Sequence, residues 1–156
     1  MSTAKDKDSR HGYYFEDLEV GMQAEFAKTV SEADILIFAG VSGDTNPLHL
    51  DAEFAKEQYF GERVAHGMLG AGMISAVIGT RLPGPGCIYV SQNLKFKAPV
   101  KIGDHMVARV EVTRLNAETR RARLKTTCQV GDVIVIDGDA SVQVPRLANS
   151  DPDSVV

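Results

Sequence analysis

Hydrophobic and polar positions change their spacing along the first part of the chain. Residues 13–21 carry aromatic side chains and end at a glycine, which predicts a short strand or extended segment. Residues 22–30 alternate between apolar and polar side chains and predict a strand. Apolar residues then recur at helical spacing, and Ser31 with Asp34 three positions later matches a capping box at the start of a helix. A second, shorter helix is expected at residues 52–60.

The most apolar segment, residues 64–79, predicts a helix from about His66 to Thr80. It is shorter than the roughly 20 residues needed to cross a bilayer, so a buried core helix is expected. Its side chains are apolar on nearly every face, and we therefore expect burial nearly all round. Its glycines lower helix stability, which indicates that other backbone packs closely against this helix.

The second half of the chain consists of runs in which apolar and polar residues alternate. Turn residues separate these runs, so we expect an antiparallel meander. Several strands combined with one apolar helix predict an α+β fold, in which the antiparallel sheet wraps around a long central helix. The alternating runs are residues 87–100, 105–115, 120–130 and 133–147.

Between the first two helices lies the segment SGDTNPLHLD, residues 42–51. Pro47 prevents one continuous helix and fixes the backbone, while the side chains of Asp44 and His49 stay free to project. A carboxylate beside an imidazole can orient it, raise its basicity and hold a water molecule. These residues alone leave an alternative, in which Asp44 makes an Asx turn and His49 packs under the sheet.

A second candidate feature is the sequence His-Gly-Met at residues 66–68, which opens the apolar helix. The first amides of a helix have no partner within it, and Gly67 lets another molecule approach closely. Such an amide can stabilise negative charge on a carbonyl oxygen, although a plain helix start against a neighbour is the alternative. Ser75 can bond its own helix backbone or a ligand. His66 is expected to bond a loop backbone, and Asn46 to position the loop or a substrate group.

Composition narrows the class of protein. The 156 residues suffice for one domain, which we expect at residues 11–148 between flexible tails at 1–10 and 149–156. The net charge of −4 disfavours nucleic acid as a partner, and no membrane association is expected. Cys87 and Cys128 lie far apart in apolar stretches and are expected to be reduced, as in a cytoplasmic protein. The N-terminus lacks the apolar run of a signal peptide.

Three segments in this order resemble the MaoC-like hydratase family, and most closely its (R)-specific enoyl-CoA hydratases, which have the hot dog fold. The D-x-N-P-x-H pattern of the first segment is specific, the second is moderately specific and the third is looser. The resemblance covers roughly residues 14–146 and shows no departure at the site positions. The segments are SGDTNPLHLD at 42–51, VAHGMLGAGMIS at 64–75 and NLKFKAPVKIGD at 93–104.

The resemblance implies a homodimer that hydrates trans-2-enoyl-CoA to the (R)-3-hydroxyacyl thioester by syn addition. It implies that Asp44 and His49 activate the water, that the Gly67 amide binds the thioester oxygen, and that Ser75 lines the pocket. No metal or cofactor is required. Basic residues near the mouth would meet coenzyme A phosphates, with Lys95, Lys97, Lys101 and Arg63 as candidates. The acyl tunnel is expected to be lined by residues such as Leu69, Met73, Ile35 and Phe54.

Three other functions compete with this interpretation. A thioesterase of the same fold often uses a carboxylate on the central helix, and residues 66–80 contain none. A dehydratase acting on 3-hydroxyacyl-[acyl carrier protein] would share the motif and run the reverse reaction. A non-catalytic acyl-thioester binding subunit would predict loss of Asp44 or His49, and both are present.

Overall fold

The computed structural model describes residues 10–147. The tails expected at residues 1–10 and 149–156 lie, apart from Arg10, outside this part of the chain. A 3₁₀ turn and a first strand precede three helices, then the long helix α4 and four further strands. The elements are η1 (Phe15–Asp17), β1 (Gln23–Thr29), α1 (Glu32–Ser42), α2 (Pro47–Leu50), α3 (Ala52–Lys56), α4 (Gly67–Thr80), β2 (Ile88–Phe96), β3 (His105–Asn116), β4 (Arg121–Val130) and β5 (Val133–Gln143).

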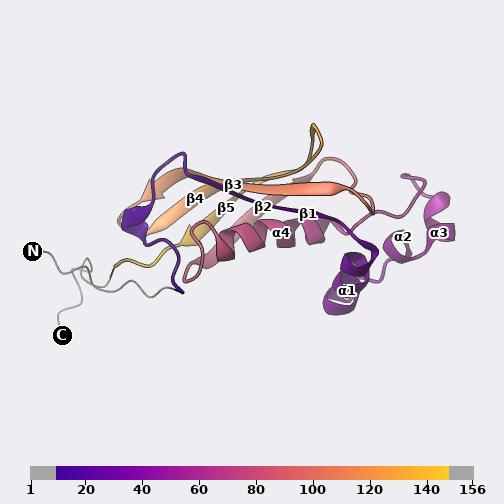
Figure 1. Ribbon diagram of the computed structural model, residues 1–156, viewed down its shortest axis with the longest axis horizontal. Coiled ribbons are helices and arrows are strands. Elements are labelled where there is room, and N and C mark those ends of the chain that lie inside the picture. Colours follow the sequence, from indigo (N-terminus) through magenta and orange to yellow (C-terminus); the bar gives the residue numbers. More distant parts are fainter. Residues whose placement is uncertain (1–9, 148–156) are drawn as a thin grey trace, which may run out of the picture.

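The five strands form one antiparallel sheet that covers α4, and the helices α1, α2 and α3 lie beyond one end of α4 (Figure 1). Along β3 the residues Ala108, Val110 and Val112 are buried, whereas Arg109 between them is exposed. This alternation places one face of the sheet against the apolar face of α4. The predicted α+β fold with a sheet around a central helix is confirmed.

The predicted meander is only partly correct. Strands β3, β4 and β5 do form consecutive hairpins, but the order across the sheet is β1-β3-β4-β5-β2. In sequence, α4 lies between β1 and β2, and it crosses the inner face of the sheet. Strands β1 and β2 therefore lie at opposite edges of the sheet. The later hairpins then fill the space between them, which alternation along each strand cannot reveal.

Helix α4 is buried on one face rather than all round, so that prediction was wrong. Ile74 and Val77 are fully buried against the sheet, whereas Met68, Gly72 and Ser75 are exposed on the other face. Met68 is apolar, and Gly72 and Ser75 are small. The exposed face therefore carries no strongly polar side chain that would mark it in the sequence. Among residues 10–147, no helix is long and apolar enough to cross a bilayer.

Two glycines of α4 lie where a larger residue would not fit. They face side chains, not the closely packed backbone that the sequence suggested. A Cβ on Gly67 would lie 2.7 Å from the Phe96 ring, and one on Gly70 would overlap Cδ1 of Ile136. Near Gly72 a Cβ would meet nothing within 4 Å. Close packing therefore concentrates in the first turn of α4.

Three local predictions changed in the structure. The extended segment expected at residues 13–21 contains the 3₁₀ helix η1. The segment expected as a loop after α1 contains the short helix α2, in which Pro47 occupies the first turn, where its missing amide hydrogen costs nothing. The helix expected at residues 52–60 is shorter, because α3 ends at Lys56.

Candidate active site

The candidate site surrounds the first turn of α4, where a cavity of about 570 Å³ opens. Asp44, His66 and Gly67 border it. Phe96 at the end of β2 and residues 97–100 after it border the cavity as well. The remaining lining residues are mostly apolar: Tyr59, Phe60, Ala65, Met68, Gly70, Phe96, Lys97, Ala98, Pro99, Val100, Met106 and Ile136.

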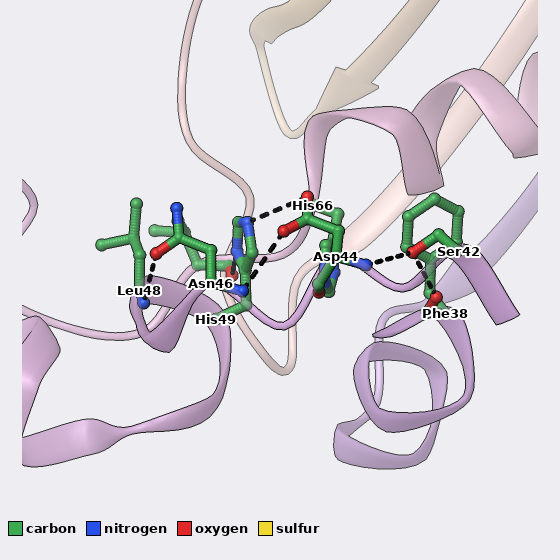
Figure 2. Close-up of polar contacts among 8 residues, drawn as sticks. Phe38, Ser42, Asp44, Asn46, Leu48, His49 and His66 are labelled. Carbon is green, nitrogen blue, oxygen red and sulfur yellow. Dashed lines mark hydrogen bonds and ion pairs between the residues drawn. The ribbon is translucent and has the colours of Figure 1, made fainter. Parts of the chain in front are cut away.

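Local hydrogen bonds shape the loop that carries Asp44 (Figure 2). The Ser42 hydroxyl donates to the Phe38 carbonyl and accepts from the Asp44 amide. Oδ1 of Asp44 accepts from the Asn46 amide at 3.3 Å, which is the Asx turn considered as an alternative. Oδ1 of Asn46 in turn accepts from the Leu48 amide and caps α2. The turn uses only one carboxylate oxygen of Asp44 and leaves Oδ2 for another partner.

His49 is buried and its ring orientation is fixed. Nδ1 lies 2.7 Å from the Val64 carbonyl, and because a carbonyl can only accept, Nδ1 carries the proton in the neutral ring. The free nitrogen, Nε2, lies 4.0 Å from Oδ2 of Asp44 (Figure 2). Arg63 holds the His49 backbone from behind, since its Nε donates to the His49 carbonyl while its guanidinium binds both carboxylate oxygens of Glu32. Arg63 is therefore committed to the loop rather than to a phosphate.

Oδ2 of Asp44 and Nε2 of His49 are both acceptors, so they cannot hydrogen-bond directly to each other while the histidine is neutral. A water molecule that donates one hydrogen bond to each atom would hold them roughly 4 Å apart. The measured separation of 4.0 Å fits this arrangement. The pair can therefore accept two hydrogen bonds from one water molecule, and His49 can accept a proton from it.

His66 is the residue before α4 and is 97% buried, with 3% of its surface exposed. Its Nε2 lies 2.8 Å from the Asp44 carbonyl and donates to it, which confirms the expected bond to a loop backbone. Its ring stacks on the His49 ring at 3.9 Å between centroids and an interplanar angle of 29°. The His66 ring also contacts the Phe38 ring, with centroids 4.8 Å apart.

Gly67 begins α4 at the edge of the cavity. Amides of the first helical turn have no partner within the helix and carry partial positive charge from the helix dipole. His66 makes no side-chain cap to these amides, unlike Ser31 at α1. The Gly67 amide at the start of α4 thus stays available to an oxygen atom in the cavity.

The group of described residues that could hold a metal ion comprises Asp44, His49 and His66, whose ligand atoms lie within 4.8 Å of one another. A metal must lie in the plane of each imidazole that binds it, but the two stacked rings direct their lone pairs along nearly parallel planes. Nδ1 of His49 and Nε2 of His66 are also already bonded to carbonyls. The cluster fits a water better than a metal.

Most residues expected to bind substrate lie elsewhere. Ser75 is exposed on the outer face of α4 and does not line the site cavity. Leu69 and Met73 line a second cavity, of about 280 Å³, between α1 and α4. Ile35 is fully buried in the core, and Phe54 is exposed on α3. Asp44 and Gly67 therefore border one cavity, His49 lies beside Asp44, and these other residues lie outside it.

Of the basic residues expected at the mouth, only Lys97 borders the site cavity. Nζ of Lys101 lies 2.6 Å from the Glu62 carboxylate, and this hydrogen bond raises the pKa of Lys101. Lys95 lines a different hollow, beside Asp137.

Sequence reasoning missed the apolar rim of the cavity. Tyr59 and Phe60 form an edge-to-face pair with ring centroids 5.1 Å apart, and both border the cavity with Met68 and Phe96. Tyr59 is 95% exposed and Met68 is 56% exposed. The only sequence signal was an aromatic pair at the end of the helix expected at residues 52–60, directly before a glycine, and this signal is weak on its own.

The chain is similar to known proteins over most of its length. A model of the MaoC like domain matches residues 17–136. This chain belongs to the MaoC-like domain family. The resemblance of its sequence segments to that family is thereby confirmed.

Relatives of this MaoC-like chain align over most of its length. It is 55% identical over 139 residues to the 3-hydroxybutyryl-CoA dehydratase of Methylorubrum extorquens, covering 89% of this chain and 88% of the relative. It is 56% identical over 133 residues to an (R)-specific enoyl-CoA hydratase of Rhodospirillum rubrum, covering 85% and 92%. A solved (R)-hydratase from A. caviae, involved in PHA biosynthesis, superimposes with a TM-score of 0.80 at 42% identity, covering 83% of this chain and 99% of that chain.

Proposed function

We propose that this protein is an (R)-specific enoyl-CoA hydratase, which adds water to a trans-2-enoyl-CoA and reversibly dehydrates the (R)-3-hydroxyacyl-CoA. The observation that carries the proposal is the separation of 4.0 Å between Nε2 of His49 and Oδ2 of Asp44 beside the first turn of α4. The relatives that are more than half identical to this chain are named for the same reaction, written in the two directions.

In the forward direction, the pair acts on water. The water oxygen forms a bond to C3 of the substrate while Nε2 of His49 takes one water proton, and the C2–C3 π electrons move toward the thioester oxygen. Oδ2 of Asp44 keeps the second water hydrogen oriented, so the oxygen lone pair faces C3. The C2 carbon of the resulting enolate then receives the proton from the pair, which returns His49 to its neutral state. Protons and electrons balance without a further reactant.

The Gly67 amide stabilises the negative charge that develops on the thioester oxygen. Negative charge that appears only during reaction is stabilised most by donors already in place, and a backbone amide at a helix start is such a donor. The amide is close in space to the water pair because His66, the preceding residue, bonds the Asp44 carbonyl. A flat conjugated enoyl thioester could therefore place its C1 carbonyl oxygen at the Gly67 amide and its C3 at the water molecule.

We further propose that the protein acts as a homodimer. Strand β2 is at the edge of the sheet and exposes Ile88 and Val90, with 63% and 43% of their surfaces accessible. The outer face of α4, with Met68 and Ser75, is exposed as well. A second copy paired along β2 would cover both, and any contact of the Ser75 hydroxyl with substrate depends on that copy enclosing it.

A cytoplasmic location also belongs to this proposal. Cys87 and Cys128 are both free thiols in the described part of the chain. Burial raises the pKa of Cys128 to about 12, which keeps its thiol protonated and unreactive. Both properties suit a reducing compartment.

The direct test is product analysis. Purified protein is incubated with crotonyl-CoA, the loss of enoyl absorbance is followed, and the 3-hydroxybutyryl-CoA product is resolved on a chiral phase. The (R) product alone is expected. Crotonyl-[acyl carrier protein] in a parallel assay distinguishes the rival dehydratase, which would turn over the carrier-bound substrate in preference to the coenzyme A thioester. Absence of hydration with both substrates would refute the proposed reaction.

A further inference from the structure

Nδ1 of His66 is a buried nitrogen with no hydrogen-bond partner among residues 10–147. Because Nε2 donates to the Asp44 carbonyl, Nδ1 of the neutral ring holds only a lone pair. Burying an unpaired polar atom costs free energy, and an apolar side chain would avoid that cost. The ring must therefore contribute something that an apolar residue of similar size would not.

One contact of His66 needs its nitrogen, and a second needs its ring. Its Nε2 is 2.8 Å from the carbonyl oxygen of Asp44, so it fixes the backbone from which the carboxylate projects. Its ring lies 3.9 Å from the His49 ring, so it limits rotation of the imidazole that takes the proton. Phe38 supports the ring with a further contact at 4.8 Å between centroids, and this keeps it against His49.

A third link is covalent. His66 is bonded to Gly67, the residue whose amide opens α4, and its own side chain does not cap the helix. Serine, threonine or aspartate, which are usual at this position of a helix, would accept hydrogen bonds from first-turn amides and compete with a substrate oxygen. Histidine leaves those amides open and turns its donor toward Asp44 instead.

We infer that His66 is a positioning residue that holds Asp44, His49 and the Gly67 amide in one fixed relation. This inference rests on the proposed hydratase function for its kinetic consequences. His66 acts through these groups and touches no reacting atom. His66 makes two separable contributions: its Nε2 donates a hydrogen bond to the Asp44 carbonyl, and its ring packs against the His49 ring.

Two substitutions separate the parts. His66→Gln keeps a nitrogen donor the same number of bonds from Cα as Nε2 but removes the ring. His66→Phe keeps a stacking ring but removes the donor. His66→Ala removes both. The matched controls are His105→Gln and His105→Phe, because His105 is exposed on β3 and away from the cavity.

Steady-state hydration of crotonyl-CoA is measured for each variant together with thermal unfolding. We expect kcat to fall about ten-fold for His66→Gln and for His66→Phe, as for the loss of one well-placed contact. The KM should stay within about two-fold and His66→Ala should lose more than either. Equal kcat for the His66 and His105 variants would overturn the inference, as would losses of activity that match losses of folded protein at the assay temperature.

A second measurement does not depend on turnover. Long-range ¹H–¹⁵N correlation spectra of the wild-type imidazoles report which ring nitrogen carries the proton. We expect the proton on Nε2 of His66 and on Nδ1 of His49. The opposite tautomer at His66 would overturn the inference even if the enzyme is active. An inactive wild type with the expected tautomers would contradict the proposed reaction and leave the positioning geometry supported.

Discussion

Nε2 of His49 and Oδ2 of Asp44 lie 4.0 Å apart, beyond the range of a direct hydrogen bond. Nδ1 of His49 is bound to the Val64 carbonyl, and Oδ1 of Asp44 is bound to the Asn46 amide. Each residue therefore uses one polar atom to fix itself and presents the other to the same point. In the proposed mechanism these two acceptor atoms hold the water molecule that attacks the substrate.

The Gly67 amide can be tested with a pair of substitutions that share one steric change. Gly67→Pro removes the amide hydrogen, and proline is tolerated in the first turn of a helix. Gly67→Ala keeps the hydrogen, and both variants add a Cβ that would press on Phe96 at 2.7 Å. We expect kcat of Gly67→Pro to be lower than that of Gly67→Ala by about 100-fold, as for loss of an oxyanion donor. Similar kcat values for the two variants would show that this amide does not serve the reaction.

The capping box of α1 gives stability a pH dependence. Partial burial alone would raise the pKa of Asp34, but hydrogen bonds from Lys28 and Ser31 outweigh it and the pKa is lowered below 3.8. A lowered folded pKa means that the stabilisation is present above the unfolded pKa and is lost as pH falls through the folded pKa. We expect Asp34→Asn to reduce the free energy of unfolding by about 1 kcal/mol near neutral pH.

Urea unfolding at several pH values checks this expectation. The difference between wild type and Asp34→Asn should shrink as the pH falls below the unfolded pKa of Asp34, because the wild-type carboxylate is then protonated as well. A difference that stays constant down to the acid limit would mean that the charge of Asp34 contributes nothing. The substitution lies on α1 and outside the site cavity, so activity at neutral pH is a measure of fold integrity only.

The proposed dimer predicts different behaviour at the two edges of the sheet. Val90→Lys places a charge on the exposed edge strand β2, whereas Ala27→Lys places one on β1 at the opposite edge. Charge on a paired edge is unfavourable, so Val90→Lys should shift the protein toward monomer while Ala27→Lys should not. Sedimentation velocity across a concentration series measures the mass. A wild type that sediments as a monomer at all concentrations would contradict the proposed dimer.

Much of the fold could be predicted because local rules and tertiary packing agree. Ser31 and Asp34 form the expected capping box, and the alternation along β3 separates the buried Val110 from the exposed Arg109. The position of β2 could not be predicted in this way, because a strand's alternation shows which face is buried but not which strand lies beside it. The outer face of α4 was missed because Gly72 and Ser75 carry too little surface to mark it as polar.

The candidate site was predictable where one short segment carries it. Asp44 and His49 stand in the same loop, but their spacing and Pro47 alone left the Asx-turn alternative open, and the resemblance of three segments to a known family favoured the pair. Phe96 and Tyr59 were not predictable, because strand β2 and the loop before α4 reach the cavity only through the tertiary fold. The bond of His66 to a loop backbone was expected, but its partner, the Asp44 carbonyl 22 residues earlier, and the ring contact with His49 leave no sequence pattern.

The most direct test of the water-holding pair is a double-mutant cycle. Hydration of crotonyl-CoA is measured for wild type, Asp44→Asn, His49→Gln and the double variant, with correct folding checked by thermal unfolding. If the two side chains act on one water, each single variant should lose about 100-fold or more in kcat and the double variant should lose little beyond the worse single variant. Full activity in either single variant, or losses that simply multiply in the double variant, would contradict the account.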